Sequence, residues 1–138
     1  MKINCPVEHV EHVNVVKWMN QNYPGVIIWT IPNGAKLSPQ TVSKLKSEGL
    51  HDGAPDLEIP AWDIYIEMKR VDPKVCKVYP EQIATIEYLQ ECGKHATICY
   101  GAQEAIDFIQ SVLDKHPRYL QIKARYIKPE KGESGRKR

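Results

Sequence analysis

Apolar side chains recur at three- and four-residue intervals in several parts of the chain, a spacing that places them on one face of a helix. The first stripe predicts a helix from about Glu8 to Asn22, before the stop signal Tyr23-Pro24-Gly25. Ser38-Pro39 has the form of an N-cap followed by a first-turn proline, and it predicts a short helix closed by Gly49. Two more helices are predicted, one from Pro80 to a C-cap at Gly93 and one from Ala102 to Lys115.

Other apolar runs have the character of β-strands. Residues 26–31 are almost continuously apolar and β-branched, which predicts a strand buried on both faces. From Trp62 to Lys69 apolar and polar residues alternate, so one face of that strand should belong to the core. Further strands are predicted over 56–59 and 96–100, and an edge strand or docked extension over 120–126. Because helices fall between strands, we expect an α/β fold with a mixed β-sheet flanked by helices.

Length and composition fit this picture. The 138 residues suit one domain, and the shares of charged (26%) and hydrophobic (42%) residues are typical of globular proteins. No apolar run approaches the ~20 residues that span a membrane. The first twelve residues lack the apolar core of a signal peptide, so we expect an intracellular protein, in the cytoplasm or nucleoid. The cysteines are far apart and are expected to be free thiols rather than zinc ligands: Cys5, Cys76, Cys92 and Cys99.

The charges are unevenly distributed along the chain. Residues 123–138 carry seven basic and two acidic side chains, a net charge of +5, which leaves −3 on residues 1–122. A basic tail on a mildly acidic body is typical of proteins that contact a polyanion, although a solvated chain end has the same composition. We therefore expect a domain over residues 1–127 followed by a basic, disordered tail over residues 128–138.

The polar face of the 62–69 strand contains a candidate catalytic site. Glu67 and Lys69 point to the same side of that strand, roughly 6–7 Å apart. The preceding strand begins at Asp56, and the short connection predicts a hairpin that sets Asp56 opposite Glu67. Two carboxylates beside a lysine form an oxygen-rich site suited to Mg²⁺. The alternative is a solvent-exposed ion pair, because exposed strand faces often carry such residues.

The order of several motifs resembles a known family. Pro55-Asp56, followed after eleven positions by Glu67-Met68-Lys69, matches the PD-(D/E)xK nuclease signature, and the surrounding sequence is similar to the VRR-NUC branch of that superfamily. The resemblance covers about residues 8–113. The stretches that carry it are EHVEHVNVVKWM (8–19), YPGVIIWTIPNGA (23–35), LKSEGLHDGAPDLEIP (45–60), IYIEMKR (64–70), YPEQIATIEYL (79–89) and GAQEAIDFI (101–109).

The resemblance implies a restriction-endonuclease-like core that hydrolyses DNA phosphodiesters with Mg²⁺ or Mn²⁺. It implies that Asp56, Glu67 and the main-chain carbonyl of Met68 bind the metal and that Lys69 is the catalytic lysine. Gln82 matches a family glutamine that borders the site, and the family's helix glutamate is matched to Glu11, with Glu8 as the alternative. Two departures from the family pattern, at Ala35 and Tyr79, bear on substrate fit rather than on chemistry.

Several residues near the expected cleft are candidates for binding DNA: Asn33, Lys36, Arg70 and Lys74. Each of them is also an ordinary turn or surface residue, so the assignment is a hypothesis. The family analogy further suggests structure-selective cutting of branched or Holliday-junction DNA, and a homodimer would provide two active sites for the two strands. The alternative function is a non-catalytic DNA-binding or assembly module on a nuclease scaffold.

Overall fold

The structure, a computed structural model, describes residues 5–32, 37–121 and 126–130. Its principal elements, in chain order, are α1 (Glu8–Asn22), β1 (Trp29–Thr30), α2 (Pro39–Ser47), β2 (Leu57–Ile59), β3 (Ile64–Lys69), α3 (Pro80–Glu91), β4 (His95–Tyr100) and α4 (Ala102–Lys115). Three short 3₁₀ turns lie at Pro60–Trp62, Pro73–Val75 and Pro117–Leu120. None of the described helices is long and apolar enough to cross a membrane.

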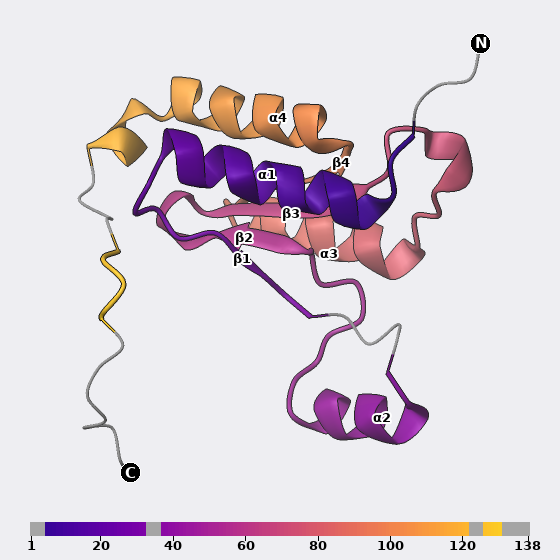
Figure 1. Cartoon of the computed structure of the whole chain (residues 1–138). Helices are drawn as coiled ribbons and strands as arrows, with labels where there is room; N and C mark the ends of the chain where they lie inside the picture. Colours follow the sequence, from indigo (N-terminus) through magenta and orange to yellow (C-terminus); the bar gives the residue numbers. More distant parts are fainter. Residues whose placement is uncertain (1–4, 33–36, 122–125, 131–138) are drawn as a thin grey trace.

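The four strands form one mixed sheet in the order β1-β2-β3-β4. The pairs β1–β2 and β2–β3 are antiparallel, whereas β3 and β4 are parallel and are joined through α3. Helices α1 and α4 lie side by side over one face of the sheet, and α3 lies against the other face (Figure 1). The expected α/β architecture, a mixed sheet flanked by helices, is confirmed.

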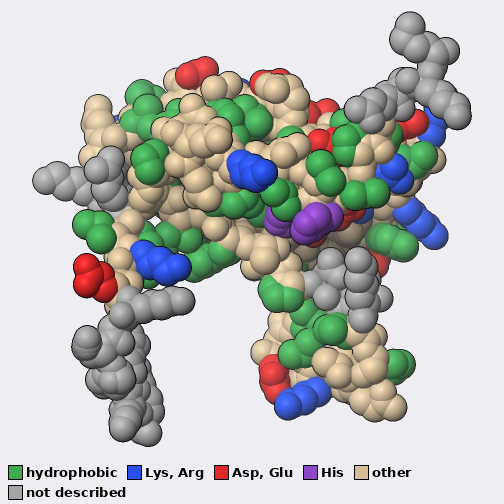
Figure 2. Space-filling view, in the orientation of Figure 1, with side chains coloured by type: hydrophobic (Ala, Val, Ile, Leu, Met, Phe, Trp, Pro, Cys, Tyr) green, Lys and Arg blue, Asp and Glu red, His purple; other side chains and the backbone are tan. Residues whose placement is uncertain are grey.

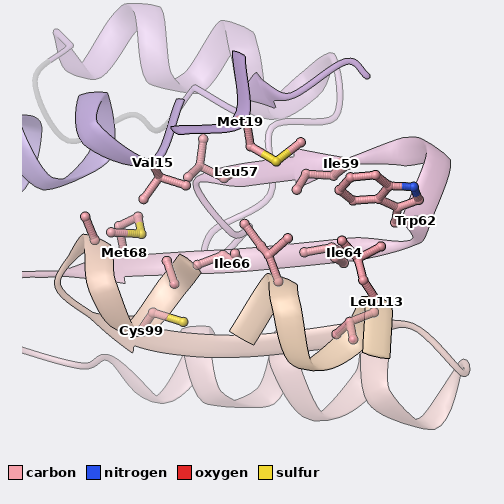
Figure 3. Close-up of a cluster of buried hydrophobic side chains, with 14 residues drawn as sticks. Val15, Met19, Leu57, Ile59, Trp62, Ile64, Ile66, Met68, Cys99 and Leu113 are labelled. Carbon is pink, nitrogen blue, oxygen red and sulfur yellow. The ribbon is translucent and has the colours of Figure 1, made fainter. Parts of the chain in front are cut away.

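The main hydrophobic core lies between the sheet and the α1–α4 layer. Ile64, Ile66 and Met68 alternate along β3 and are at most 1% exposed, as the pleat predicts. Val15 and Met19 of α1 point toward these strands from the helix layer (Figure 3). Burial of this kind stabilises the fold by about 25 cal/mol for each Å² of apolar surface removed from water.

The strand predicted over residues 26–31 is wrong in extent and in burial. Only Trp29 and Thr30 are in β1, and Trp29 is 49% exposed. The reason is the short partner strand: β2 has three residues, and Thr30 pairs with Leu57 at one end of it. Val26 and Ile28 pack against the core without belonging to the sheet.

The strand predicted to begin at Trp62 begins at Ile64 instead, because Pro60–Trp62 form a 3₁₀ turn and Asp63 has a left-handed backbone (φ 53°). Trp62 is still buried in the core. At the other end of the chain, Leu120 closes a 3₁₀ turn rather than starting a strand. Gln121 and Tyr126 are not in a strand either, and residues 122–125 of the predicted strand and 131–138 of the tail lie outside the described residues.

Helix α2 projects from the rest of the molecule (Figure 1). Its start is as predicted: the Ser38 side chain accepts a hydrogen bond from the Thr41 backbone N–H. No residue of α2 is buried, and hydrophobic side chains are visible on the surface of this projection (Figure 2). The chain returns from α2 to β2 through residues 48–56, and this return segment forms one side of the site described next.

Candidate active site

The β2–β3 hairpin brings two carboxylates together at the end of the sheet. Leu57 pairs with Ile66 in an antiparallel register, and the same register continued by one residue sets Asp56 opposite Glu67. The Asp56 carboxylate accepts a hydrogen bond of 2.7 Å from the backbone N–H of Met68. Asp56 is 7% exposed and Glu67 is 4% exposed, so neither is a solvated surface acid. The hairpin predicted from the sequence therefore forms, and it produces a buried acidic pair.

Burial and mutual repulsion perturb this pair. Desolvation by burial is the largest cause of a rise in the pKa of Glu67 to about 8; the charge of Asp56 acts in the same direction, and the nearby Lys69 ammonium acts in the opposite direction. A side-chain hydrogen bond between Glu67 and Asp56 contributes to the same shift. In the metal-free protein at neutral pH, Glu67 therefore holds a proton that it shares with Asp56.

Lys69 is the third charged residue buried at this end of β3, at 6% exposure. Its Nζ lies 3.6 Å from a carboxylate oxygen of Glu67 and donates a hydrogen bond of 2.8 Å to the backbone carbonyl of Lys77. The loop between β3 and α3 thus restrains the Lys69 ammonium through the Lys77 carbonyl. Because that carbonyl restrains the side chain, the positive charge is held beside the carboxylates rather than extended into solvent.

Gln82 links α3 to the acidic pair. Its Nε2 donates to Glu67 at 3.2 Å, and its Oε1 accepts from the Tyr79 backbone N–H at 3.0 Å. The hydrogen bond to Tyr79 is part of the capping box at the N-terminus of α3. The Gln82 side chain therefore caps this helix and contacts the acidic pair at the same time. Gln82 accordingly orients the Glu67 carboxylate, and the sequence-based placement of Gln82 at the site border agrees with the geometry.

These side chains open into a cleft of about 420 Å³. Asp56, Glu67, Lys69 and Gln82 line one part of it. The return segment from α2 lines another part through residues 50–54, and Glu8, in the first turn of α1, completes the acidic wall. The negative charge of Glu8 also raises the pKa of Glu67. The structure thus places the alternative helix glutamate, Glu8, at the cleft.

Glu11 lies elsewhere, which corrects its assignment to the cleft. It is 6% exposed, and its Oε1 accepts a hydrogen bond of 3.3 Å from the backbone N–H of Ala102, the first residue of α4. Its Oε2 is buried without a hydrogen-bond partner beside Gly101. Gly101 has φ +90°, and a side chain there would meet Val71 at 2.6 Å. The Glu11 side chain therefore binds the N-terminus of α4, where a carboxylate group is favoured.

The acidic pair fits a hard divalent cation. Within the described residues no group of three or more His, Cys, Asp or Glu side chains could hold a metal. Mg²⁺, however, is often held by one or two carboxylates and completes its octahedron with water. A cation between Asp56 and Glu67 would take the place of the shared proton and balance their charges. The backbone N–H of Met68 binds Asp56 at this point, and a metal-binding role for the Met68 carbonyl stays a prediction.

The predicted DNA contacts are only partly described. Asn33 and Lys36 lie outside the described residues. Arg70 donates to the backbone carbonyls of Cys5 and Pro6 at 2.8 and 3.0 Å, so it ties the N-terminal segment to the end of β3. Lys74 is exposed in the loop that follows β3. Its side chain remains a candidate for a phosphate contact.

Comparison with solved structures identifies a similar chain described as a VRR_NUC domain protein. The two share a TM-score of 0.65 and 24% sequence identity, over 83% of this chain and 92% of the other. The chain has the fold of a VRR-NUC domain. No family model matches the sequence, and no curated protein matches it. The likeness therefore establishes the VRR-NUC fold, while activity must be inferred from the site itself.

Proposed function

We propose that this protein is a divalent-metal-dependent deoxyribonuclease. The observation that supports the proposal best is the buried group formed by Asp56, Glu67 and Lys69 on the VRR-NUC fold. Burying an acidic pair beside a lysine costs free energy of desolvation, and such a cost is kept where the charges serve a function or are compensated by other interactions. Phosphodiester hydrolysis uses all three residues.

Each side chain has a role in this reaction. Asp56 and Glu67 would hold Mg²⁺ or Mn²⁺, which polarises the scissile phosphate and lowers the pKa of a bound water. Lys69 supplies a positive charge fixed by the Lys77 carbonyl, and it offsets negative charge that develops on the phosphate oxygens in the transition state. Gln82 keeps the Glu67 carboxylate in one orientation through its amide. Glu8 adds negative charge at the edge of the cleft, where it can orient a water.

The DNA backbone would be held by basic residues. Lys74 and the basic side chains of residues 123–138 are the candidates, and such contacts position DNA without reading its sequence. Structure-selective cutting of branched or Holliday-junction DNA, and a homodimer that presents two clefts, belong to the same proposal. An intracellular location fits a DNA substrate.

The test is cleavage of supercoiled plasmid and of a four-way junction with Mg²⁺, with Mn²⁺ and with EDTA. The wild-type protein should cut only with metal, and Asp56→Asn should be inactive. Glu87→Gln is the control: Glu87 is exposed on α3 and does not line the cleft, so this variant should cut normally. DNA binding without cleavage by the wild-type protein under every metal condition would instead favour the non-catalytic module.

A further inference from the structure

A second hollow lies directly beside the catalytic cleft. Its volume is about 880 Å³, within the range of small-molecule pockets, and most of its lining is apolar. Its walls come from α3, from the return segment after α2, and from Ile31. The cleft and this hollow, called here the side groove, share five lining residues: Leu50, His51, Asp52, Ala54 and Glu81.

The side groove follows the same face of the sheet as the catalytic residues. Tyr65 lines the groove and Glu67 lines the cleft, and the two are two positions apart along β3. Two residues of a strand span roughly 6.6 Å, so the groove begins one pleat repeat from the acidic pair. Pro55, which also lines the groove, directly precedes Asp56. A molecule held by the acidic pair can therefore extend into the groove.

The return segment that separates the two hollows is firmly attached to α3. His51 Nε2 lies 3.2 Å from the Thr85 hydroxyl, and Gly53 has φ +87° where a side chain would come within 2.4 Å of the Glu81 carbonyl oxygen. An ion pair of 3.0 Å between Lys46 and Asp52 joins α2 to the same segment. The groove thus has a defined wall rather than a loose loop.

The lining of the groove favours a flat, uncharged ring with polar edges. The Tyr88 ring is 66% exposed on the α3 wall, and Tyr65 lies in the same hollow. Glu81 brings negative charge and Asp52 is already paired with Lys46, so a phosphate is disfavoured there. A nucleobase matches these conditions, since every base has a π-face for an aromatic ring and edge groups for polar contacts.

We propose that the side groove receives a nucleobase of the DNA strand whose phosphate lies in the catalytic cleft. A base inside a duplex is stacked and paired, and it cannot enter a pocket without leaving the helix. The substrate therefore carries an unpaired nucleotide beside the bond that is cut. This inference rests on the proposed nuclease function and adds to it a feature of the DNA that the protein selects.

The direct test is binding, because it needs no cleavage. Oligonucleotides would carry the fluorescent base 2-aminopurine either in a short unpaired segment beside a duplex or inside a fully paired duplex, and would be titrated in EDTA. Tyr88→Ala should weaken binding of the DNA with the unpaired segment by roughly 10-fold, the scale of one base–aromatic stack. Tyr88→Phe should bind like wild type, because the ring is kept.

Ile83→Ala is the matched control: Ile83 is 44% exposed on the same helix and does not line the groove. It should leave both affinities unchanged. The inference is overturned if Tyr88→Ala binds both DNAs as wild type does, if it weakens both equally, or if Tyr88→Phe loses as much as Tyr88→Ala. Metal-dependent cleavage with no effect of Tyr88→Ala would support the nuclease function and overturn base binding in the groove. Binding that depends on the unpaired base and on Tyr88, without cleavage under any metal condition, would support the groove as a base-binding site and contradict the nuclease function.

Discussion

On one face of β3, Ile64, Ile66 and Met68 are covered by α1 and α4, whereas on the other face Glu67 and Lys69 lie beside Asp56 and α3. Both sets are almost completely shielded from water. The first face gains stability from apolar burial, and on the second face hydrogen bonds and a shared proton offset the cost of desolvated charge. One six-residue strand therefore joins a stabilising surface to the proposed active site.

The largest effect on stability is expected on the apolar face. Ile66→Ala should lower the free energy of unfolding by about 2–5 kcal/mol, because it removes buried methyl groups and leaves a cavity in the core. Urea denaturation measures this change. Ile83→Ala, on the exposed side of α3, should shift the midpoint far less. Equal losses in the two variants would mean that the β3 core face is not close-packed.

On the charged face, Lys69→Ala should act on catalysis. Removing the ammonium should lower the single-turnover cleavage rate by roughly 10²-fold, the scale of one missing transition-state stabiliser. Lys77→Ala keeps the backbone carbonyl that holds Lys69 and serves as the control. Mn²⁺ affinity, followed by calorimetry, should change less than the rate. Loss of metal binding in Lys69→Ala would contradict the division of roles between lysine and carboxylates.

Glu67 should make the metal-free protein less stable as pH rises. Its pKa in the folded protein is raised to about 8 from the ordinary 4.5, so between these values the folded state binds more protons than the unfolded state. Stability in EDTA should fall from about pH 4.5 to about pH 8 and then level off. Glu67→Gln removes the titrating group, so thermal melts should show a higher Tm than wild type near pH 8 and a flatter pH dependence.

Melts below about pH 4.5 provide the internal control, because Glu67 is protonated in both the folded and the unfolded state there. The wild type and Glu67→Gln should then have similar Tm values. The account of the acidic pair fails if the variant is less stable than wild type at about pH 8. Ile66→Ala and Glu67→Gln, at adjacent positions, are thus expected to change stability in opposite directions at that pH.

The smallest effect concerns the basic tail, residues 128–138. Deleting residues 128–138 removes a net charge of +3 from the chain. DNA affinity should weaken, and the plot of log affinity against log salt should become shallower by about 0.9 for each phosphate that the tail neutralises. Single-turnover cleavage at saturating protein should not change. Identical affinities and slopes across 50–200 mM salt, roughly the range in which such contacts weaken, would show that the tail does not bind DNA.

Local signals in the sequence were sufficient for most helices. The ends of α1 and α4 agree with the predicted residues, Ser38 caps α2, and Gly93 follows α3 with φ +83°. These helix ends depend only on residues close by in the sequence, so the sequence pattern is sufficient to predict them. The carboxylate pair was also predictable, because a pleat and one short hairpin connect Asp56 to Glu67.

Features that depend on distant partners were not predictable. The apolar run at 26–31 could not reveal that β2 offers only three residues for pairing. Glu8 and Glu11 are one turn apart on α1, so their spacing cannot decide which one reaches the cleft. That choice is made by α4, whose first N–H meets Glu11. The Lys77 carbonyl behind Lys69 and the side groove likewise come from tertiary packing.

The central claim is that Asp56 and Glu67 bind one divalent ion, and calorimetric titration with Mn²⁺ tests it most directly. The wild-type protein and Glu87→Gln should each bind one ion per active site, with protons released as Glu67 loses its shared proton. Asp56→Asn should lose this binding while retaining the circular dichroism spectrum of the folded protein. Undiminished Mn²⁺ binding by folded Asp56→Asn would contradict the claim.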